Sequence, residues 1–260
     1  MNDQILTRIE NGIGVLTFNK PEVMNAVEPK YLLGVIDAFQ SLDRDPQVRA
    51  IVITGAGRGF CAGAERQFLK DVSQMPAHEI RDTVYASFQG VARAIKLSEK
   101  PTVAAVNGPA IGAGCEFALA PDLRVTTPKA FFCENWIDLG LIPPLGGMFL
   151  LPRLIGLERA TNMILRAQRV YGEDAVKIGL ASECVEPDQL MPAAMKIAEE
   201  LASRPRAAMR IARQGLRRGM DGTLAGEWEF NVQAQAILLN GPDFGEAAAA
   251  IEGGRKPVFR

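Results

Sequence analysis

The sequence has few of the residues that hold metal ions or cross-link small secreted domains. Its 260 residues include one histidine, His78, and four cysteines that are far apart and form no Cys-x-x-Cys pair: Cys61, Cys115, Cys133 and Cys184. Neither the spacing of zinc ligands nor a disulfide framework can be recognised in this pattern. We therefore expect a protein of a reducing, cytoplasmic compartment that has no bound metal.

Long apolar runs and a charge excess are also missing. No window has eighteen uninterrupted apolar residues, and the opening MNDQILTRIE lacks the basic and apolar stretches of an export signal, so we expect no membrane span and no signal peptide. The formal net charge is -1, which gives no broad basic field for nucleic acid. With 48% hydrophobic and 23% charged residues, the composition is that of a globular protein with a sizeable core.

The chain alternates strand-like and helix-like segments. Asn11-Gly12 between two apolar runs predicts a hairpin of strands near 4–10 and 13–18. Apolar residues at helical spacing predict an amphipathic helix over 28–42 and another over 77–97. The runs 48–55, 101–108, 122–127 and 130–134 are typical of strands, and a short apolar helix is expected at 115–120. Beyond about residue 187, the segments 188–204, 206–218 and 223–239 favour helices. This order predicts an α/β fold with a helical C-terminal part.

Two glycine-rich loops, 55–63 and 108–114, each lie between a strand and a helix. Helices that begin at such loops leave backbone N–H groups without partners, which suits an anion or an oxyanion. The first loop is not a dinucleotide-binding fingerprint because Phe60 stands where the third glycine is needed, and neither loop has a P-loop ending. Taken singly, either loop could also be a plain turn between packed elements.

Four segments and the tail together resemble the crotonase, or enoyl-CoA hydratase/isomerase, superfamily. They are NKPEVMNAV at 19–27, GAGRGFCAGAER at 55–66, KPTVAAVNGPAIGAGCEFALAPDLRV at 100–125, LGLIPPLGGMFLLPRLIG at 139–156, and the final RKPVF. The resemblance implies a spiral of ββα turns over residues 1–190, with the CoA and acyl site, and a helical region over 191–260 that drives formation of a trimer or a dimer of trimers. Coenzyme A would be part of the substrate, and no permanently bound cofactor is expected.

The same resemblance implies an oxyanion hole made by two peptide N–H groups. The matching positions are Ala64, which follows Ala62 and Gly63, and Ala113, which follows Gly112. Small residues around them would let a thioester approach the main chain, and each donor would contribute roughly 3 kcal/mol to an oxyanionic transition state.

The resemblance further implies a proton-transferring glutamate at Glu116, for which a capping or ion-pairing role is the alternative. The second glutamate position of the family's hydratases holds Trp136, which cannot transfer protons and could instead line the acyl pocket. If this segment is extended, Glu134, Trp136 and Asp138 share one face, and either acid could be a displaced second carboxylate. For Asp138, a structural turn is the alternative.

Three more positions follow from the resemblance. Glu65 stands where the family usually has aspartate, and with Arg66 it is expected to fix the loop, although Arg66 could also meet the acyl group or a CoA phosphate. Lys256 lies where the family often contacts a phosphate. His78 is expected to be solvated, and Cys115 to pack as an ordinary core residue rather than to act as a nucleophile.

Three functions are consistent with these residues. The first is a lyase that adds or removes water across the double bond of a 2-enoyl-CoA, with Glu116 moving protons. The second keeps the oxyanion hole but isomerises a double bond, hydrolyses the thioester or cleaves a C–C bond, because Trp136 replaces a glutamate. The third is a CoA-binding protein without catalytic activity.

Overall fold

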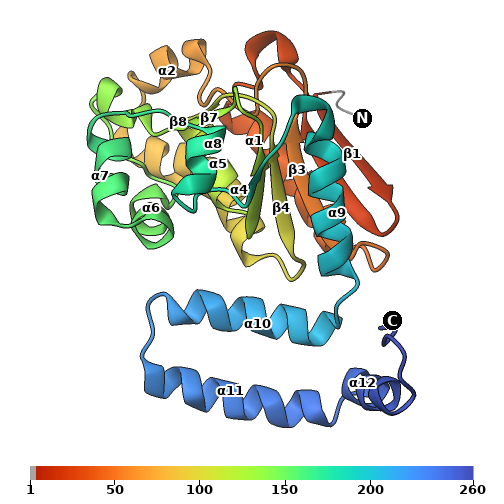
Figure 1. Cartoon of the computed structure of the whole chain (residues 1–260). Coiled ribbons are helices and arrows are strands. Elements are labelled where there is room, and N and C mark those ends of the chain that lie inside the picture. Colours follow the sequence, from red (N-terminus) through yellow and green to blue (C-terminus); the bar gives the residue numbers. More distant parts are fainter. Residues whose placement is uncertain (1–3, 260) are drawn as a thin grey trace.

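A computed structural model describes residues 4–259 of the chain, which are built around two β-sheets (Figure 1). The larger sheet has the strand order β1-β2-β3-β4-β6-β9, in which β1 and β2 are antiparallel and each later neighbour is parallel. The smaller sheet has the order β5-β7-β8. The strands are β1 (Ile5–Glu10), β2 (Ile13–Phe18), β3 (Ala50–Gly55), β4 (Thr102–Val106), β5 (Ala110–Ile111), β6 (Leu123–Thr126), β7 (Phe131–Cys133), β8 (Val170–Tyr171) and β9 (Glu183–Cys184).

The predicted N-terminal hairpin is confirmed. Asn11 and Gly12 have φ angles of 51° and 77° and connect strands in which Glu10 pairs with Ile13. Two successive residues with positive φ match the right-handed twist of the strands they join, and asparagine and glycine are the residues that tolerate this conformation.

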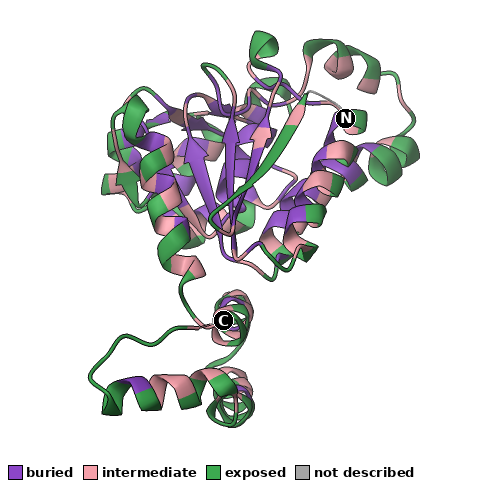
Figure 2. Cartoon of the chain, turned by 90° about the vertical axis from the view of Figure 1, so that its right-hand side faces the viewer, coloured by how far each residue is buried: buried purple, intermediate pink, exposed green. Residues whose placement is uncertain are grey.

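Successive side chains along each strand of the larger sheet point to opposite faces, so the sheet contributes to two apolar layers. One face packs against α9 (Leu190–Ala202) through a buried cluster: Ile13, Val15, Ala50, Val52, Val103, Ala105, Val125, Leu190, Ala194 and Ala198. The other face is covered by α1 (Pro29–Arg44) and α4 (Tyr85–Leu97) in the main core. Figure 2 shows the sheet as the most completely buried part of the chain.

The predicted helix over 77–97 is interrupted. It consists of a short α3 (Ala77–Glu79), a π-helical turn at Ile80–Val84, and α4. A π turn holds an extra residue relative to an α turn, so it shifts the helix face that the remaining residues present to the core. Amphipathic spacing alone does not reveal such an insertion.

The remaining helices of the body connect the strands. They are α2 (Arg66–Val72), α5 (Ala113–Leu119), α6 (Gly147–Ile155), α7 (Leu157–Leu165) and α8 (Gly172–Lys177), together with 3-10 helices at Pro21–Val23, Asn135–Leu139 and Pro187–Gln189. The short apolar helix expected at 115–120 is α5. Within residues 4–259, no helix is both long and apolar enough to cross a bilayer.

The last three helices, α10 (Arg206–Gly219), α11 (Leu224–Leu239) and α12 (Pro242–Glu252), extend away from the body, whereas α9 packs on the sheet (Figure 1). The boundary predicted at residue 190 therefore lies at the start of α9, whose apolar side chains belong to the core of the body. The attachment of α10 is polar: Arg213 donates a hydrogen bond of 2.8 Å to Asp122 and another to the carbonyl of Ser98. Figure 2 shows α10 to α12 as largely exposed.

Candidate active site

The two glycine-rich loops lie against each other as a short parallel pair. The amide of Cys61 donates to Pro109 O, and the amide of Ile111 donates to Cys61 O at 3.0 Å, which pairs Cys61 with Ala110. Ala64 lies three residues after Cys61, and Ala113 lies three residues after Ala110. The pairing therefore carries these two positions, 49 residues apart in the sequence, to the same place in the fold.

The amide N–H groups of Ala64 and Ala113 donate no hydrogen bond within residues 4–259. Ala113 is the first residue of α5, so it has no intrahelical acceptor, while the neighbours of Ala64 use the backbone of Val27. Unpaired backbone N–H groups in packed surroundings are uncommon in proteins. Both of these N–H groups lie near the place where the two loops meet.

Glycine is required where the loops meet. Gly63 has a φ of 86°, and a Cβ there would lie 2.8 Å from Ile111 O and 3.8 Å from the nitrogen of Ala113. Gly112 has a φ of 53°, and a Cβ there would lie 3.7 Å from the Trp136 ring. These distances put Gly63 beside Ala113 and the indole beside the second loop.

Glu116 lies on α5, one turn after Ala113, and is buried. Its Oε2 accepts hydrogen bonds from the amides of Leu145 (2.8 Å) and Gly147 (2.6 Å), and its Oε1 has no partner within the described residues. Burial raises the pKa of Glu116 to about 7, against the opposing effect of these two hydrogen bonds. A carboxyl that is partly protonated near neutral pH suits acid–base chemistry.

Glu134 lies beside Glu116. A Cβ placed on Gly147 would be 3.0 Å from Oε1 of Glu134 and 3.1 Å from Oε2 of Glu116. Glu134 is fully buried, and its Oε2 accepts a hydrogen bond of 3.0 Å from the indole N–H of Trp136. Burial and the charge of Glu116 raise the pKa of Glu134 well above its ordinary value.

The segment that holds Trp136 is not extended. Residues 135–139 form a 3-10 helix, so the expected strand-like alternation is wrong there. Glu134 and Trp136 still meet through the indole hydrogen bond, but Asp138 is exposed and does not join the two glutamates.

A cavity of about 700 Å³ opens beside the first loop. Four of the predicted residues line this cavity: Ala62, Ala64, Glu65 and Arg66. Glu65 also forms an ion pair with Lys20. A carboxylate held by an ammonium group within the chain fits the expected loop-fixing role, while Arg66 at the start of α2 is exposed toward the cavity. Lys256 is exposed in the tail after α12 and is not among the lining residues.

Comparison with known proteins decides the family. A family model described as enoyl-CoA hydratase/isomerase matches residues 8–260. The chain belongs to the enoyl-CoA hydratase/isomerase family. It is therefore a crotonase-family enzyme that acts on CoA thioesters, and its two sheets with C-terminal helices are the crotonase fold.

Relatives and solved structures match over nearly the whole chain. The chain is 34% identical to crotonyl-CoA hydratase of Syntrophomonas wolfei, covering 99% of this chain and 98% of the relative. It is 30% identical to 1,2-epoxyphenylacetyl-CoA isomerase of Escherichia coli, covering 100% and 99%. The crystal structure of an enoyl-CoA hydratase from Polaromonas sp. JS666 superposes with a TM-score of 0.93 at 28% identity, covering 98% and 99%.

Three residues near this crotonase site escaped the sequence analysis. Asn25 is fully buried, and its amide group donates to the carbonyls of Ala56, Gly59 and Phe60, which fixes the first loop. Asn25 and Lys20 both lie in the NKPEVMNAV segment, which was the signal that could have found them. Tyr85 on α4 lies close enough to Glu116 for that carboxylate, after burial, to raise the pKa of its phenol.

The other predicted residues have ordinary surroundings. His78 is exposed, and Cys115 is fully buried with a pKa raised well above its ordinary value by burial and by Glu134. A thiol in that environment is a poor source of thiolate.

Proposed function

We propose that this crotonase-family enzyme is a lyase that adds water to the double bond of a 2-enoyl-CoA, with Glu116 as its acid and base. The observation that carries the proposal is the position of the buried Glu116 one helical turn after Ala113, whose free amide lies beside the loop of Ala64. The relatives named as hydratases support the same reaction.

In the proposed reaction, the amides of Ala64 and Ala113 donate to the thioester carbonyl oxygen. The Glu116 carboxylate takes a proton from water as the water oxygen bonds to the β-carbon, and the double-bond electrons move to the thioester oxygen as an enolate. Protonated Glu116 then gives its proton to the α-carbon, and the carbonyl re-forms. Each donor to the enolate oxygen would contribute roughly 3 kcal/mol in the transition state.

We propose that Glu134 is a second carboxyl group beside Glu116, and that the two together carry a single negative charge. Two adjacent buried carboxyls do not both ionise readily, so one proton is retained between them near neutral pH. The effect of the charge of Glu116 on the pKa of Glu134 and the hydrogen bond that Glu134 accepts from Trp136 support this role.

The cavity beside the first loop is proposed to hold the CoA moiety. Ala62, Glu65 and Arg66 line it next to Ala64, and Arg66 offers a guanidinium group to a phosphate. Trp136, against Gly112, is proposed as a wall for the acyl group. Within one chain Lys256 lies outside this cavity, so a contact between Lys256 and CoA would require the tail of another subunit.

We also expect a homotrimer or a dimer of trimers. The support is the number of large apolar side chains that α11 and α12 expose in a single chain: Leu224, Trp228, Val232, Ile237, Leu239, Phe244 and Ile251. Clusters of this kind commonly mark surfaces between proteins. Light scattering coupled to size-exclusion chromatography would give the mass of the assembly.

The test of the lyase proposal is Glu116→Gln with crotonyl-CoA as substrate. We expect kcat to fall by about two to four orders of magnitude while CoA-ester affinity is retained, as for loss of a general acid–base group. Glu229→Gln, an exposed glutamate on α11, is the matched control and should behave as wild type. Undiminished turnover of the Glu116 variant would remove this residue from the mechanism.

A second candidate, double-bond isomerisation, is favoured by one observation: Trp136 occupies the second glutamate position of the hydratases. Thioester hydrolysis and C–C cleavage belong to the same branch. Trp136→Glu should then create or raise hydratase activity, whereas Trp136→Gln should not. Rapid hydration of crotonyl-CoA by the wild type would contradict this branch, and a mass-spectrometric panel of acyl-CoA esters would identify the product. A protein without catalysis would bind CoA esters and form no product from any of them.

A further inference from the structure

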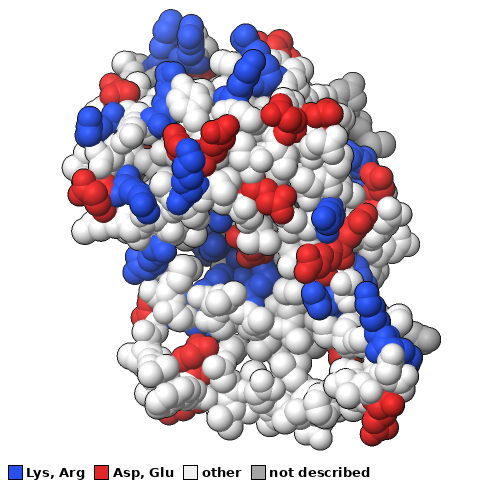
Figure 3. Space-filling model, viewed as in Figure 1, with Lys and Arg blue, Asp and Glu red and all other residues white. Residues whose placement is uncertain are grey.

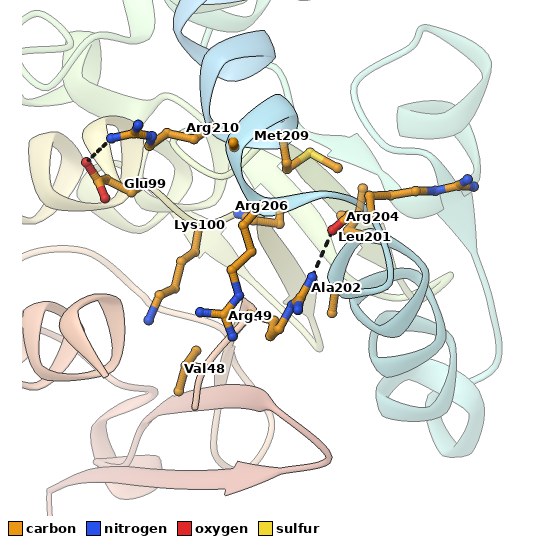
Figure 4. Close-up of a pocket in the computed structure, with 12 residues that line it drawn as sticks. Val48, Arg49, Glu99, Lys100, Leu201, Ala202, Arg204, Arg206, Met209 and Arg210 are labelled. Carbon is orange, nitrogen blue, oxygen red and sulfur yellow. Dashed lines mark hydrogen bonds and ion pairs between the residues drawn. The ribbon is translucent and has the colours of Figure 1, made fainter. Parts of the chain in front are cut away.

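A second cavity lies at the joint where α10 meets the body (Figure 4), and it shares no lining residue with the cavity beside the first loop. It measures about 310 Å³, at the lower end of the range for small-molecule sites. Its walls come from the loop before β3, the loop before β4, the end of α9 and the start of α10.

The side chains that line this cavity are mostly positively charged. Five cationic residues line the cavity, Arg49, Lys100, Arg204, Arg206 and Arg210, and the only acidic lining residue is Glu99. Glu99 is already engaged by Arg210 at 3.4 Å. Most of this positive charge therefore has no anionic partner in the lining.

Three of these cations are held by neutral backbone oxygens. Arg49 donates to Arg204 O at 2.9 Å, Arg206 donates to Pro46 O at 3.0 Å, and Lys100 donates to Leu42 O at 2.8 Å. None of the three pairs with a carboxylate within residues 4–259.

The three groups also act on one another. Arg206 lowers the pKa values of both Arg49 and Lys100, in each case after the larger effect of burial. For Lys100, the carboxylates of Asp43 and Asp45 raise the pKa by more than Arg206 lowers it, and for Arg49 the carboxylate of Asp243 opposes Arg206 with a smaller effect. Figure 4 shows Arg49, Lys100 and Arg206 side by side, with Arg204 turned away. Like charges gathered in a partly buried space are unfavourable unless an anion lies between them.

The sequence of α10 explains how the cluster arises. Arg206, Arg210, Arg213 and Arg217 are spaced as one face of a helix, and this face is turned to the body. Figure 3 shows Lys and Arg side chains gathered in the hollow between the body and α10. Arg213 pairs with Asp122 and Arg210 with Glu99, whereas Arg206 forms no ion pair within residues 4–259.

We propose that this cavity binds a diphosphate-bearing anion, held by the guanidinium groups of Arg49 and Arg206 and the ammonium group of Lys100. Guanidinium groups bind phosphate oxygens through two parallel hydrogen bonds, and the cavity holds two of them beside an ammonium group. The bound anion connects the loops before β3 and β4 to the start of α10. It thereby fixes how the last three helices are set against the body.

The test is calorimetric titration of the full-length protein with inorganic pyrophosphate, in wild type and in the double variant Arg49→Gln/Arg206→Gln. Wild type should bind, and added salt should weaken the binding because the contacts are ionic. The double variant should lose about tenfold or more in affinity, as expected when charge-assisted hydrogen bonds are removed. Arg206→Lys retains the charge and should bind better than Arg206→Gln. Lys100 is left unchanged because its ammonium group also holds the loop at Leu42.

Two controls separate this site from others. Arg8→Gln/Arg166→Gln removes two exposed arginines elsewhere and should leave pyrophosphate affinity unchanged. Arg58→Gln/Arg66→Gln alters the cavity proposed for CoA and should also leave it unchanged. ADP tests whether a nucleotide diphosphate is accepted as well as the free anion. Equal affinity in wild type and the Arg49/Arg206 variant, absence of binding by wild type, or loss of binding only in the Arg58/Arg66 variant would each overturn the proposal. The titration measures binding of pyrophosphate and not turnover of acyl-CoA. Its result can therefore be interpreted even if the proposed function is wrong.

Discussion

The indole N–H of Trp136 donates a hydrogen bond of 3.0 Å to Oε2 of Glu134, and both side chains are buried. Trp136 thus holds in place a glutamate that lies two residues earlier in the chain. The indole N–H lowers the pKa values of both Glu134 and its neighbour Glu116, although burial has the larger and opposite effect on both.

Trp136→Phe removes this donor and keeps an aromatic ring. The free energy of unfolding should fall by about 1–3 kcal/mol, because a buried carboxyl oxygen loses its hydrogen bond. Chemical denaturation followed by circular dichroism would measure the change. Tyr171→Phe is the control, since Tyr171 is 44% exposed and lies outside α11 and α12, and its stability should be that of wild type. Equal stabilities of the two variants would show that the indole bond contributes nothing.

The pH dependence of kcat/KM should report Glu116. If Glu116 acts as the base that accepts the proton of water, it must be ionised, so kcat/KM should decline as pH falls below about 7. Trp136→Phe should move this decline to higher pH, because the nearby indole N–H lowers the pKa of Glu116. Rate profiles of wild type and Trp136→Phe would test both statements. A wild-type profile that stays flat through this range would contradict the assignment of Glu116 as the base.

Stability should also depend on pH through the two glutamates. Both have folded-state pKa values above those of the unfolded chain, so the folded protein holds their protons more tightly. Their stabilising contribution is present below about pH 4.5, the ordinary value, and is lost as pH rises through about 7 for Glu116. The loss for Glu116 is on the order of 3 kcal/mol, by the free energy that corresponds to such a shift.

Urea unfolding at several pH values would measure this loss. Glu116→Gln should show a weaker fall in stability with rising pH than wild type, because its amide cannot ionise. Glu229→Gln, exposed on α11, should keep the wild-type slope. Identical slopes in all three proteins would mean that Glu116 is not the group that titrates.

The sequence was a good guide where local chemistry dominates. Asn11 and Gly12 predicted the hairpin because few residues accept two positive φ angles in succession, and continuous apolar runs located the buried strands. The family resemblance selected Ala64, Ala113 and Glu116, and the fold brings their loops together.

The features of the candidate site that the sequence did not predict depend on contacts between distant segments of the chain. The amides of Leu145 and Gly147 that hold Glu116 come from 29 and 31 residues later in the chain, at a spacing that no periodicity reveals. Strand-like alternation predicted that Glu134, Trp136 and Asp138 share a face. In a 3-10 helix, however, residues three apart align rather than residues two apart, so Asp138 points to solvent.

Gly63→Ala should damage the site more than the same change at another left-handed glycine. Gly63 and Gly140 have φ angles of 86° and 70°, so alanine is strained at both by roughly 1–2 kcal/mol. At Gly140 the new methyl group meets nothing within 4 Å, but at Gly63 it lies 2.8 Å from Ile111 O. The loops must then separate at the point where the amides of Ala64 and Ala113 lie together.

The comparison of these two variants isolates the contact between the loops from backbone strain. Gly63→Ala should lose more stability than Gly140→Ala, and its kcat should fall by about tenfold to a thousandfold, the effect of displacing an oxyanion-hole donor. Unfolding and steady-state kinetics on the same preparations would give both quantities. If the two variants were equally active, the close approach of Gly63 to Ile111 would have no bearing on catalysis, and the proposed pair of donors would lose its structural basis.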